Sequence, residues 1–150
     1  MKKLKFADLI QASNAVHALS EQDKSKSYVF TMTVRFRLAD NQAQLKRQIE
    51  RIQAEKNKLI TQYGEKDEKG QYTVRRASEK WAEFEAAIKP TDEEEIEVEL
   101  KTISLEELAN SRVVKTRDDK GKVSEDTVEN QISLDVITAL ISTGILATSD

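Results

Sequence analysis

Residues 38–63 read LADNQAQLKRQIERIQAEKNKLITQY, a stretch without proline or glycine. Its apolar positions are separated by steps of seven, four and three residues, which places them on one stripe of a helix. The stripe consists of Leu38, Leu45, Ile49, Ile52, the aliphatic stem of Lys56, and Leu59. A helix of this length cannot form a core alone, so we expect the stripe to pack against other parts of the chain or against another protein.

The segment that precedes this stretch fits two structures. Over residues 28–38 apolar and polar residues alternate, and the β-branched content is typical of a strand. The apolar set is Phe30, Met32, Val34, Phe36 and Leu38. Several of these positions also fit helical spacing, and no helix breaker separates them from the long stretch. Continuity favours one helix over residues 26–63, with Ser25 or Ser27 as its N-cap; a strand over 28–38 is the alternative.

The N-terminal residues predict a short strand followed by a helix. Residues 2–6 alternate lysines with Leu4 and Phe6, as in a half-buried strand. Residues 8–19 place Leu9, Ala12, Val16 and Leu19 on one helical face. Residues 20–27 are polar and predict a turn.

A second helix is predicted beyond the long one. Gly64 follows the last turn of the long helix, where a left-handed C-cap belongs, and residues 65–70 predict a charged turn. Residues 78–89 then fit a helix with Trp81 and Phe84 on its buried side, ended by Pro90. The two helices are expected to form an antiparallel hairpin, closed by Tyr63 and Tyr72.

The periodicity changes after Pro90. Ile96, Val98 and Leu100 alternate with charged residues, which predicts a half-buried strand. Residues 103–108 fit the end of a strand, a capping serine and a short helix. Further predicted elements are a hairpin over 112–124 with its turn at 118–121, and a last helix over 132–144.

These elements predict an α+β fold. It comprises a long antiparallel helical hairpin, a small antiparallel or mixed β-sheet, and a C-terminal helix, within a single domain of residues 1–150. We expect the sheet to contain the N-terminal strand and the strand at Ile96, with the ribbon at 112–124 as a further candidate member.

Composition excludes several kinds of chemistry. The chain has no cysteine and one histidine, which excludes disulfides, thiolate nucleophiles and sulfur-based zinc sites and leaves little metal chemistry. The 24 basic and 27 acidic residues give a net charge of −3, which does not favour wholesale binding to nucleic acid. The longest weakly polar run, at 137–147, is too short to cross a bilayer. We therefore expect a cytoplasmic protein that does not enter membranes.

Two charged sets are candidate partner-binding surfaces. The acidic set contains Asp92 together with Glu93, Glu94, Glu95, Glu97 and Glu99, and the basic set contains Arg35, Arg37, Arg47 and Arg51. For both sets a solvated outer face is the favoured interpretation and a binding surface is the alternative. His17 fits a surface histidine that pairs with Glu21 better than a catalytic base. No residue is predicted to be catalytic or to bind a cofactor or a metal.

Residues 59–72, LITQYGEKDEKGQY, end a long charged helix in a Tyr-Gly-acid-Lys-Asp turn. A second helix, an acidic alternating strand and the segment ISLEEL at 103–108 follow. This order resembles a family of small uncharacterised proteins of tailed phages and prophages, grouped under a domain of unknown function. The segment 112–124 departs from the simplest version of that pattern. The resemblance implies a protein of the bacterial host cytoplasm and carries over no catalytic residue.

The sequence thus predicts a non-catalytic, phage-type protein that binds another macromolecule, either a host factor such as a defence component or a phage assembly partner. The expected partner is a protein rather than nucleic acid or a small-molecule substrate. The alternative is an oligomeric phage structural or assembly protein. Its copies would associate along the long helix through Leu45, Ile49, Ile52 and Leu59.

Overall fold

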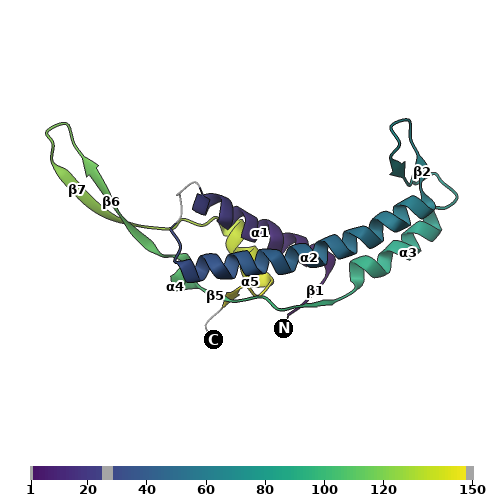
Figure 1. Cartoon of the computed structure of the whole chain (residues 1–150), viewed down its shortest axis with the longest axis horizontal. Coiled ribbons are helices and arrows are strands. Elements are labelled where there is room, and N and C mark those ends of the chain that lie inside the picture. Colours follow the sequence, from purple (N-terminus) through teal and green to yellow (C-terminus); the bar gives the residue numbers. More distant parts are fainter. Residues whose placement is uncertain (1, 25–28, 148–150) are drawn as a thin grey trace.

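The long axis of the molecule is set by one helix, α2 (Met32–Tyr63), which has 32 residues (Figure 1). The structure is a computed structural model that describes residues 2–24 and 29–147. Residues 32–38 are helical, so the strand alternative for this segment is wrong. The helix begins at Met32 rather than at residue 26, because the Thr31 hydroxyl caps it by accepting the N–H of Val34 at 3.3 Å. The predicted caps Ser25 and Ser27 lie outside the described residues.

The apolar stripe of α2 faces the core, as predicted. Val34, Leu38, Leu45 and Ile52 are buried. Lys56 also belongs to the stripe, since its side chain is only 14% exposed. Its ammonium group lies 3.9 Å from the centroid of the Phe6 ring and forms an ion pair with Asp92. Lys56 therefore joins α2 to α1 and to α3.

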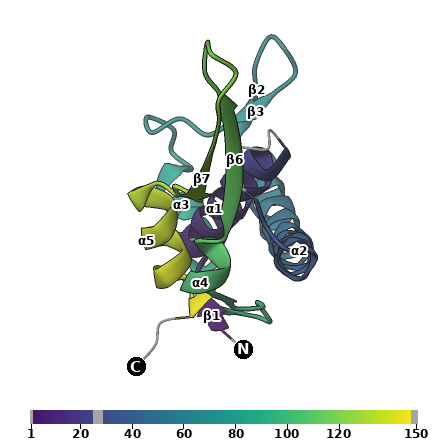
Figure 2. The same ribbon diagram turned by 90° about the vertical axis from the view of Figure 1, so that its left-hand side faces the viewer.

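Helix α1 (Phe6–Lys24) packs against α2, from the Asp23–Arg35 ion pair near the start of α2 to the contact of Phe6 with Lys56. The four predicted core residues of α1 are all buried: Leu9, Ala12, Val16 and Leu19. The helix continues beyond the predicted end at residue 19, because residues 20–24 contain strong helix formers and no breaker. Helix α5 (Leu134–Ser142) contacts α1 as well, so that α1 lies between α2 and α5 (Figure 2). Ser133 caps α5, which confirms the predicted C-terminal helix.

Helix α3 (Trp81–Glu93) packs against α2, which confirms the helical hairpin. Phe84 is buried, and its ring centroid lies 6.2 Å from that of Tyr63 and 5.7 Å from that of Trp81. The prediction that Pro90 ends this helix is wrong, since α3 continues to Glu93. Only one turn follows Pro90, and the N–H of Glu94 still donates to the Pro90 carbonyl at 2.9 Å. The backbone disruption that proline causes is therefore confined to the helix end.

A short ribbon, β2 (Glu65–Lys66) and β3 (Tyr72–Thr73), connects α2 to α3. Gly64 begins this connection with φ −90°, so the predicted left-handed cap is wrong. Glycine is needed here for close approach instead. A Cβ atom at this position would collide with the Ile60 carbonyl oxygen and lie 2.9 Å from that of Thr73. Tyr72 is 42% exposed on the ribbon, while Tyr63 packs on Phe84.

The remaining strands of the described chain form separate pairs rather than one sheet. Strand β1 (Lys2–Leu4) pairs antiparallel with β4 (Ile96–Val98), as predicted. Strand β5 (Ile103–Ser104) pairs in parallel with β8 (Leu146–Ala147). Strands β6 (Ser111–Arg117) and β7 (Val123–Glu129) form an antiparallel ribbon of their own, so the candidate membership of this ribbon in the small sheet is not realised. The fold is nevertheless α+β.

Helix α4 (Leu105–Leu108) follows β5 directly and has the predicted serine cap. The Ser104 hydroxyl accepts the N–H of Glu107 at 3.1 Å, and the Glu107 carboxylate accepts the N–H of Ser104 at 3.1 Å. This reciprocal capping box turns the chain from β5 into α4. Among the described residues, no helix is long and apolar enough to cross a membrane.

Asn41 connects α2 to the segment between β4 and β5. Its side chain is fully buried on the inward face of α2. It donates to the Lys101 carbonyl at 2.9 Å and accepts the Lys101 N–H at 2.7 Å. The amide therefore satisfies both backbone groups of Lys101, as a neighbouring strand would.

We expect Asn41→Leu to lower the free energy of unfolding by about 2 kcal/mol or more, because it leaves two backbone groups of Lys101 unpaired beside the core. Urea denaturation followed by circular dichroism measures the change. The control is Asn57→Leu on the exposed side of the same helix, which should change stability by about 0.5 kcal/mol or less. Equal losses for the two variants would contradict a special role for Asn41.

Candidate interaction site

The β6–β7 ribbon projects from one end of the helical body (Figure 1). Its seven residue pairs run from Ser111 opposite Glu129 to Arg117 opposite Val123. The side chains of residues 115–127 are all exposed, and Val123 is 49% exposed. The ribbon therefore presents both of its faces and both of its edges to solvent over this range. An isolated two-stranded ribbon is marginally stable in water, so it gains stability when another surface covers it.

Two asparagines fix the base of this ribbon to the body. The Asn130 side chain accepts the Val29 N–H at 2.8 Å and donates to the carbonyls of Val29 and Leu108, both at 2.9 Å. The Asn110 side chain also donates to the Val29 carbonyl, at 3.1 Å. The ribbon is thus exposed over residues 115–127 and is held by side-chain hydrogen bonds where it leaves the body.

The smaller β2–β3 ribbon projects from the opposite end of the long axis and toward the same side (Figures 1 and 2). The two tips contain the same turn. In one, Asp67 Oδ1 accepts the N–H groups of Lys69 and Gln71 at 2.8 and 2.9 Å. In the other, Asp118 Oδ1 accepts those of Lys120 and Lys122 at 2.9 and 2.8 Å. Gly70 and Gly121 complete the turns with φ values of 82° and 80°.

The predicted acidic set extends from the end of α3 through β4. Glu93 lies in the last turn of α3, where it pairs with Lys89 at 3.8 Å, and Glu94 is the C-cap. Beyond the helix, exposed acids alternate with the buried residues Ile96 and Val98. These exposed acids are Glu95, Glu97 and Glu99. The predicted alternation is confirmed, and it gives the molecule an acidic strip opposite its buried strand face.

The predicted basic set is divided around α2, because at about 100° per residue Arg35 and Arg37 point to nearly opposite sides of the helix. Arg35 pairs with Asp23 at 3.0 Å, and Arg51 pairs with Glu55 at 3.7 Å. Arg37 donates to the Glu107 carboxylate at 2.8 Å and to the Thr102 carbonyl at 3.4 Å. Arg47 is exposed on α2. Three of the four arginines are thus used in ion pairs within the chain, which weakens the case for the basic set as a partner site.

The Arg37–Glu107 pair has a defined electrostatic consequence. The pKa of Glu107 is held below its ordinary value, mainly because its carboxylate accepts the Ser104 N–H. Burial opposes this effect, while the Ser104 side chain and the charge of Arg37 lower the pKa further. The same carboxylate therefore caps α4 and anchors Arg37 of α2.

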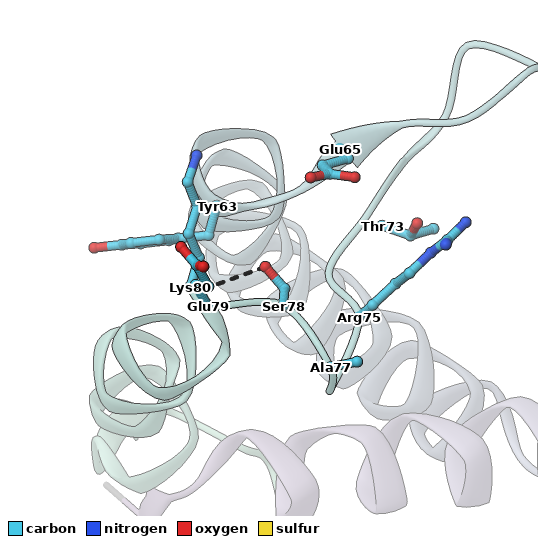
Figure 3. Close-up of a pocket in the computed structure, with 8 residues that line it drawn as sticks. All are labelled: Tyr63, Glu65, Thr73, Arg75, Ala77, Ser78, Glu79 and Lys80. Atoms are coloured by element: carbon cyan, nitrogen blue, oxygen red, sulfur yellow. Dashed lines mark hydrogen bonds between the residues drawn. The ribbon is translucent and has the colours of Figure 1, made fainter.

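His17 is exposed on α1, beside a shallow hollow that is also lined by Glu21, Asp23 and Arg35. A second hollow lies at the base of the β2–β3 ribbon (Figure 3). There Tyr63 and Arg75 point in opposite directions, and the Ser78 hydroxyl accepts the N–H of Lys80 at 3.2 Å. Over residues 2–24 and 29–147, no cluster of three or more acidic or histidine side chains could hold a metal ion.

Comparisons with protein-family models, with curated proteins and with solved structures give no match to this chain. The case for a site therefore depends on the geometry described above. The feature that best fits a contact element is the β6–β7 ribbon, which sequence reasoning identified only as a hairpin. Its signal was the turn Asp118–Gly121, a sequence of the same kind as Asp67–Gly70.

We expect Glu107 to stabilise the fold in a pH-dependent way. The pKa of Glu107 is lowered in the folded state. Its contribution to the free energy of unfolding is therefore fully present at pH values above the ordinary pKa of a glutamate, and it is lost as the pH falls through the lowered pKa. The loss of stability caused by Glu107→Gln should therefore shrink between neutral pH and about pH 3. Urea denaturation at several pH values measures it. The exposed neighbour Glu106 supplies the control, Glu106→Gln; a Glu107 effect independent of pH would contradict the assignment.

Proposed function

We propose that this chain is a non-catalytic protein that works by binding another protein, with the β6–β7 ribbon as its main contact element. The observation that carries the proposal is the ribbon itself: seven residue pairs held at the base by Asn110 and Asn130, with exposed side chains over residues 115–127. Such a ribbon adds little to the core of its own chain. Its length and rigid attachment have a clear use if its surface is covered by a partner.

The charges of the ribbon favour a protein partner over nucleic acid. Residues 111–129 contain five basic and five acidic side chains, so the segment has no net charge. Strand β6 contributes Arg112, Lys115 and Arg117, whereas β7 contributes Glu125, Asp126 and Glu129. A surface that neutralises phosphates needs an excess of positive charge. Adjacent charges of both signs instead suit the mixed polar surface of a protein, where they set orientation and specificity.

The biological setting that we propose is that of a phage-type protein in the cytoplasm of a bacterial host. The resemblance of residues 59–72 and 103–108 to the phage and prophage family supports this setting. The partner would then be a host factor, such as a defence component, or a phage assembly protein. The projecting ribbon suits either role, because both require recognition without chemistry.

Shortening the ribbon should abolish partner capture and leave the body intact. Ser111 and Glu129 lie opposite each other, so Asn-Gly in place of residues 112–128 closes the shortened ribbon with a two-residue turn. We expect the full chain to capture a specific protein from host extract and the shortened chain to lose it by at least about tenfold. Affinity capture with quantitative mass spectrometry measures the loss, and circular dichroism checks folding.

The matched control shortens the other ribbon. Lys66 and Tyr72 are paired, so Asn-Gly in place of residues 67–71 removes the second tip in the same way. This variant should retain capture. Identical captured proteins for the full chain and the chain shortened at 112–128 would contradict the proposal.

The acidic strip is a second candidate contact surface on the same chain. Replacing Glu95, Glu97 and Glu99 together by Ala leaves the buried residues of β4 unchanged, so the fold should be retained. If the strip contacts the partner, capture should weaken and become less dependent on salt. The control removes the same number of charges at three exposed glutamates outside the strip: Glu79, Glu83 and Glu85. Unchanged capture by the first variant would exclude the strip as a contact surface.

A further inference from the structure

Helix α2 has a second apolar stripe, on the side that faces away from the core. Met32 is 74% exposed and Phe36 is 64% exposed, and Ala39 and Ala43 are exposed one and two turns further on. At 100° per residue these four positions fall within an arc of about 60°, roughly opposite the buried stripe of Val34, Leu38 and Leu45. We call Met32, Phe36, Ala39 and Ala43 the outer stripe.

The outer stripe is confined to the N-terminal part of α2. Beyond Ala43 the same side of the helix carries Lys46 and Glu50, which form an i,i+4 ion pair at 3.9 Å, and the exposed Arg47. Charged side chains are typical of the solvent-exposed side of a helix, and most of α2 has them there. The outer stripe is apolar, whereas the residues that follow it on the same side of α2 are charged. Exposed Met and Phe side chains gathered in this way mark a contact surface.

The spacing of the outer stripe suits a second copy of the same chain. The steps of four, three and four residues read the same in both directions. If two helices pack antiparallel about a two-fold axis between residues 37 and 38, Met32 lies opposite Ala43 of the other copy, and Phe36 lies opposite Ala39. Each large side chain then meets a small one, in both halves of the contact.

We propose that the chain forms a two-fold symmetric dimer through this antiparallel contact between two α2 helices. The charges beside the stripe are compatible with it. On one flank Arg35 meets Gln42 of the other copy, and on the other flank Asp40 meets Thr33. Among these flanking helix residues no like charges are placed opposite each other, and beside the stripe the Lys101 ammonium group lies 5.1 Å from the centroid of the Phe36 ring. Arg35 and Asp40 are, moreover, already paired within the chain, with Asp23 at 3.0 Å and Lys101 at 3.6 Å.

This contact differs from association through the inward stripe. Leu45 and Ile52 are fully buried in the core of their own chain, and Ile49 and Leu59 are half-buried. These side chains are therefore not available to a second copy. The outer stripe spans three turns, about 18 Å, which gives a contact at the small end of stable interfaces. The dimer should consequently dissociate on dilution in the micromolar range.

The dimer goes beyond the proposed function and does not depend on it. The two surfaces are on different elements, so the chain shortened at residues 112–128 should still dimerise. Conversely, a variant that blocks dimerisation should still bind a partner through the ribbon. Failure of one proposal can therefore be told from failure of the other.

Sedimentation equilibrium over a range of concentrations tests the dimer. The wild type should show a monomer–dimer equilibrium. Phe36→Glu and Ala39→Lys should each raise the dissociation constant by at least about tenfold, because each places two charges inside the contact. Leu134→Glu is the control, since Leu134 is 77% exposed on α5 and lies outside the stripe. It should leave the equilibrium unchanged, and circular dichroism should show the same helix content for all four proteins.

A mixture of the two charged variants tests the register. When Phe36→Glu and Ala39→Lys chains are combined, the new Glu of one chain faces the new Lys of the other, and the remaining Phe36 and Ala39 keep their native contact. A one-to-one heterodimer is expected, although each variant alone is monomeric. A wild type that is monomeric at its highest soluble concentration would overturn the proposal. A dimer that survives Phe36→Glu, or a mixture that stays monomeric, would overturn it as well.

Discussion

The structure depends on the burial of one side of a helix that is longer than any single element packed against it. At 1.5 Å per residue, the 32 residues of α2 extend about 48 Å. Helix α1 packs along α2 from Arg35 to Lys56, and α3 packs against the C-terminal part of α2, so the core is drawn out along the helix (Figure 1). Lys56 links both neighbours to α2, because its stem lies on the buried stripe while its charged end reaches Phe6 and Asp92. An elongated body with free ends is the result.

Much of this arrangement could be predicted from the sequence, because periodicity and capping are local signals. The buried stripe of α2, the capping serine of the short helix after residue 103 and the C-terminal helix were all predicted correctly. The limits of the helices were predicted less well. The start of α2 depends on the hydroxyl of Thr31, and α3 continues past Pro90 by only one turn. Such local features move a helix boundary by a few residues and leave the hydrophobic periodicity unchanged.

The alternation over residues 28–38 shows how one pattern carries two meanings. In a strand it would have buried Met32, Val34 and Phe36 together. In a helix the same three residues point to different sides, so Val34 is buried in the core while Met32 and Phe36 face solvent. The outer stripe is therefore a direct outcome of placing a period-two sequence on a helix. Sequence reasoning weighed strand against helix but did not follow the helical alternative to this conclusion.

The candidate site was the least predictable part, for two physical reasons. A ribbon exposed on both faces has no hydrophobic alternation to reveal its length, so only its turn was visible. The polar contacts that hold it connect distant residues: Val29 and Asn130 are 101 positions apart, and Asn41 and Lys101 are 60 apart. Isolated asparagines give no sign of such partners.

The attachment of the ribbon has a mechanical consequence. The side chain of Asn130 holds Val29 and Leu108 together, and Val29 lies two residues before Thr31, which caps α2. A pull on the tip near Gly121 is therefore transmitted through the strands to the beginning of the longest helix. The side-chain amides of Asn110 and Asn130, which both donate to the Val29 carbonyl, are the points at which a displacement of the far end would act on the body.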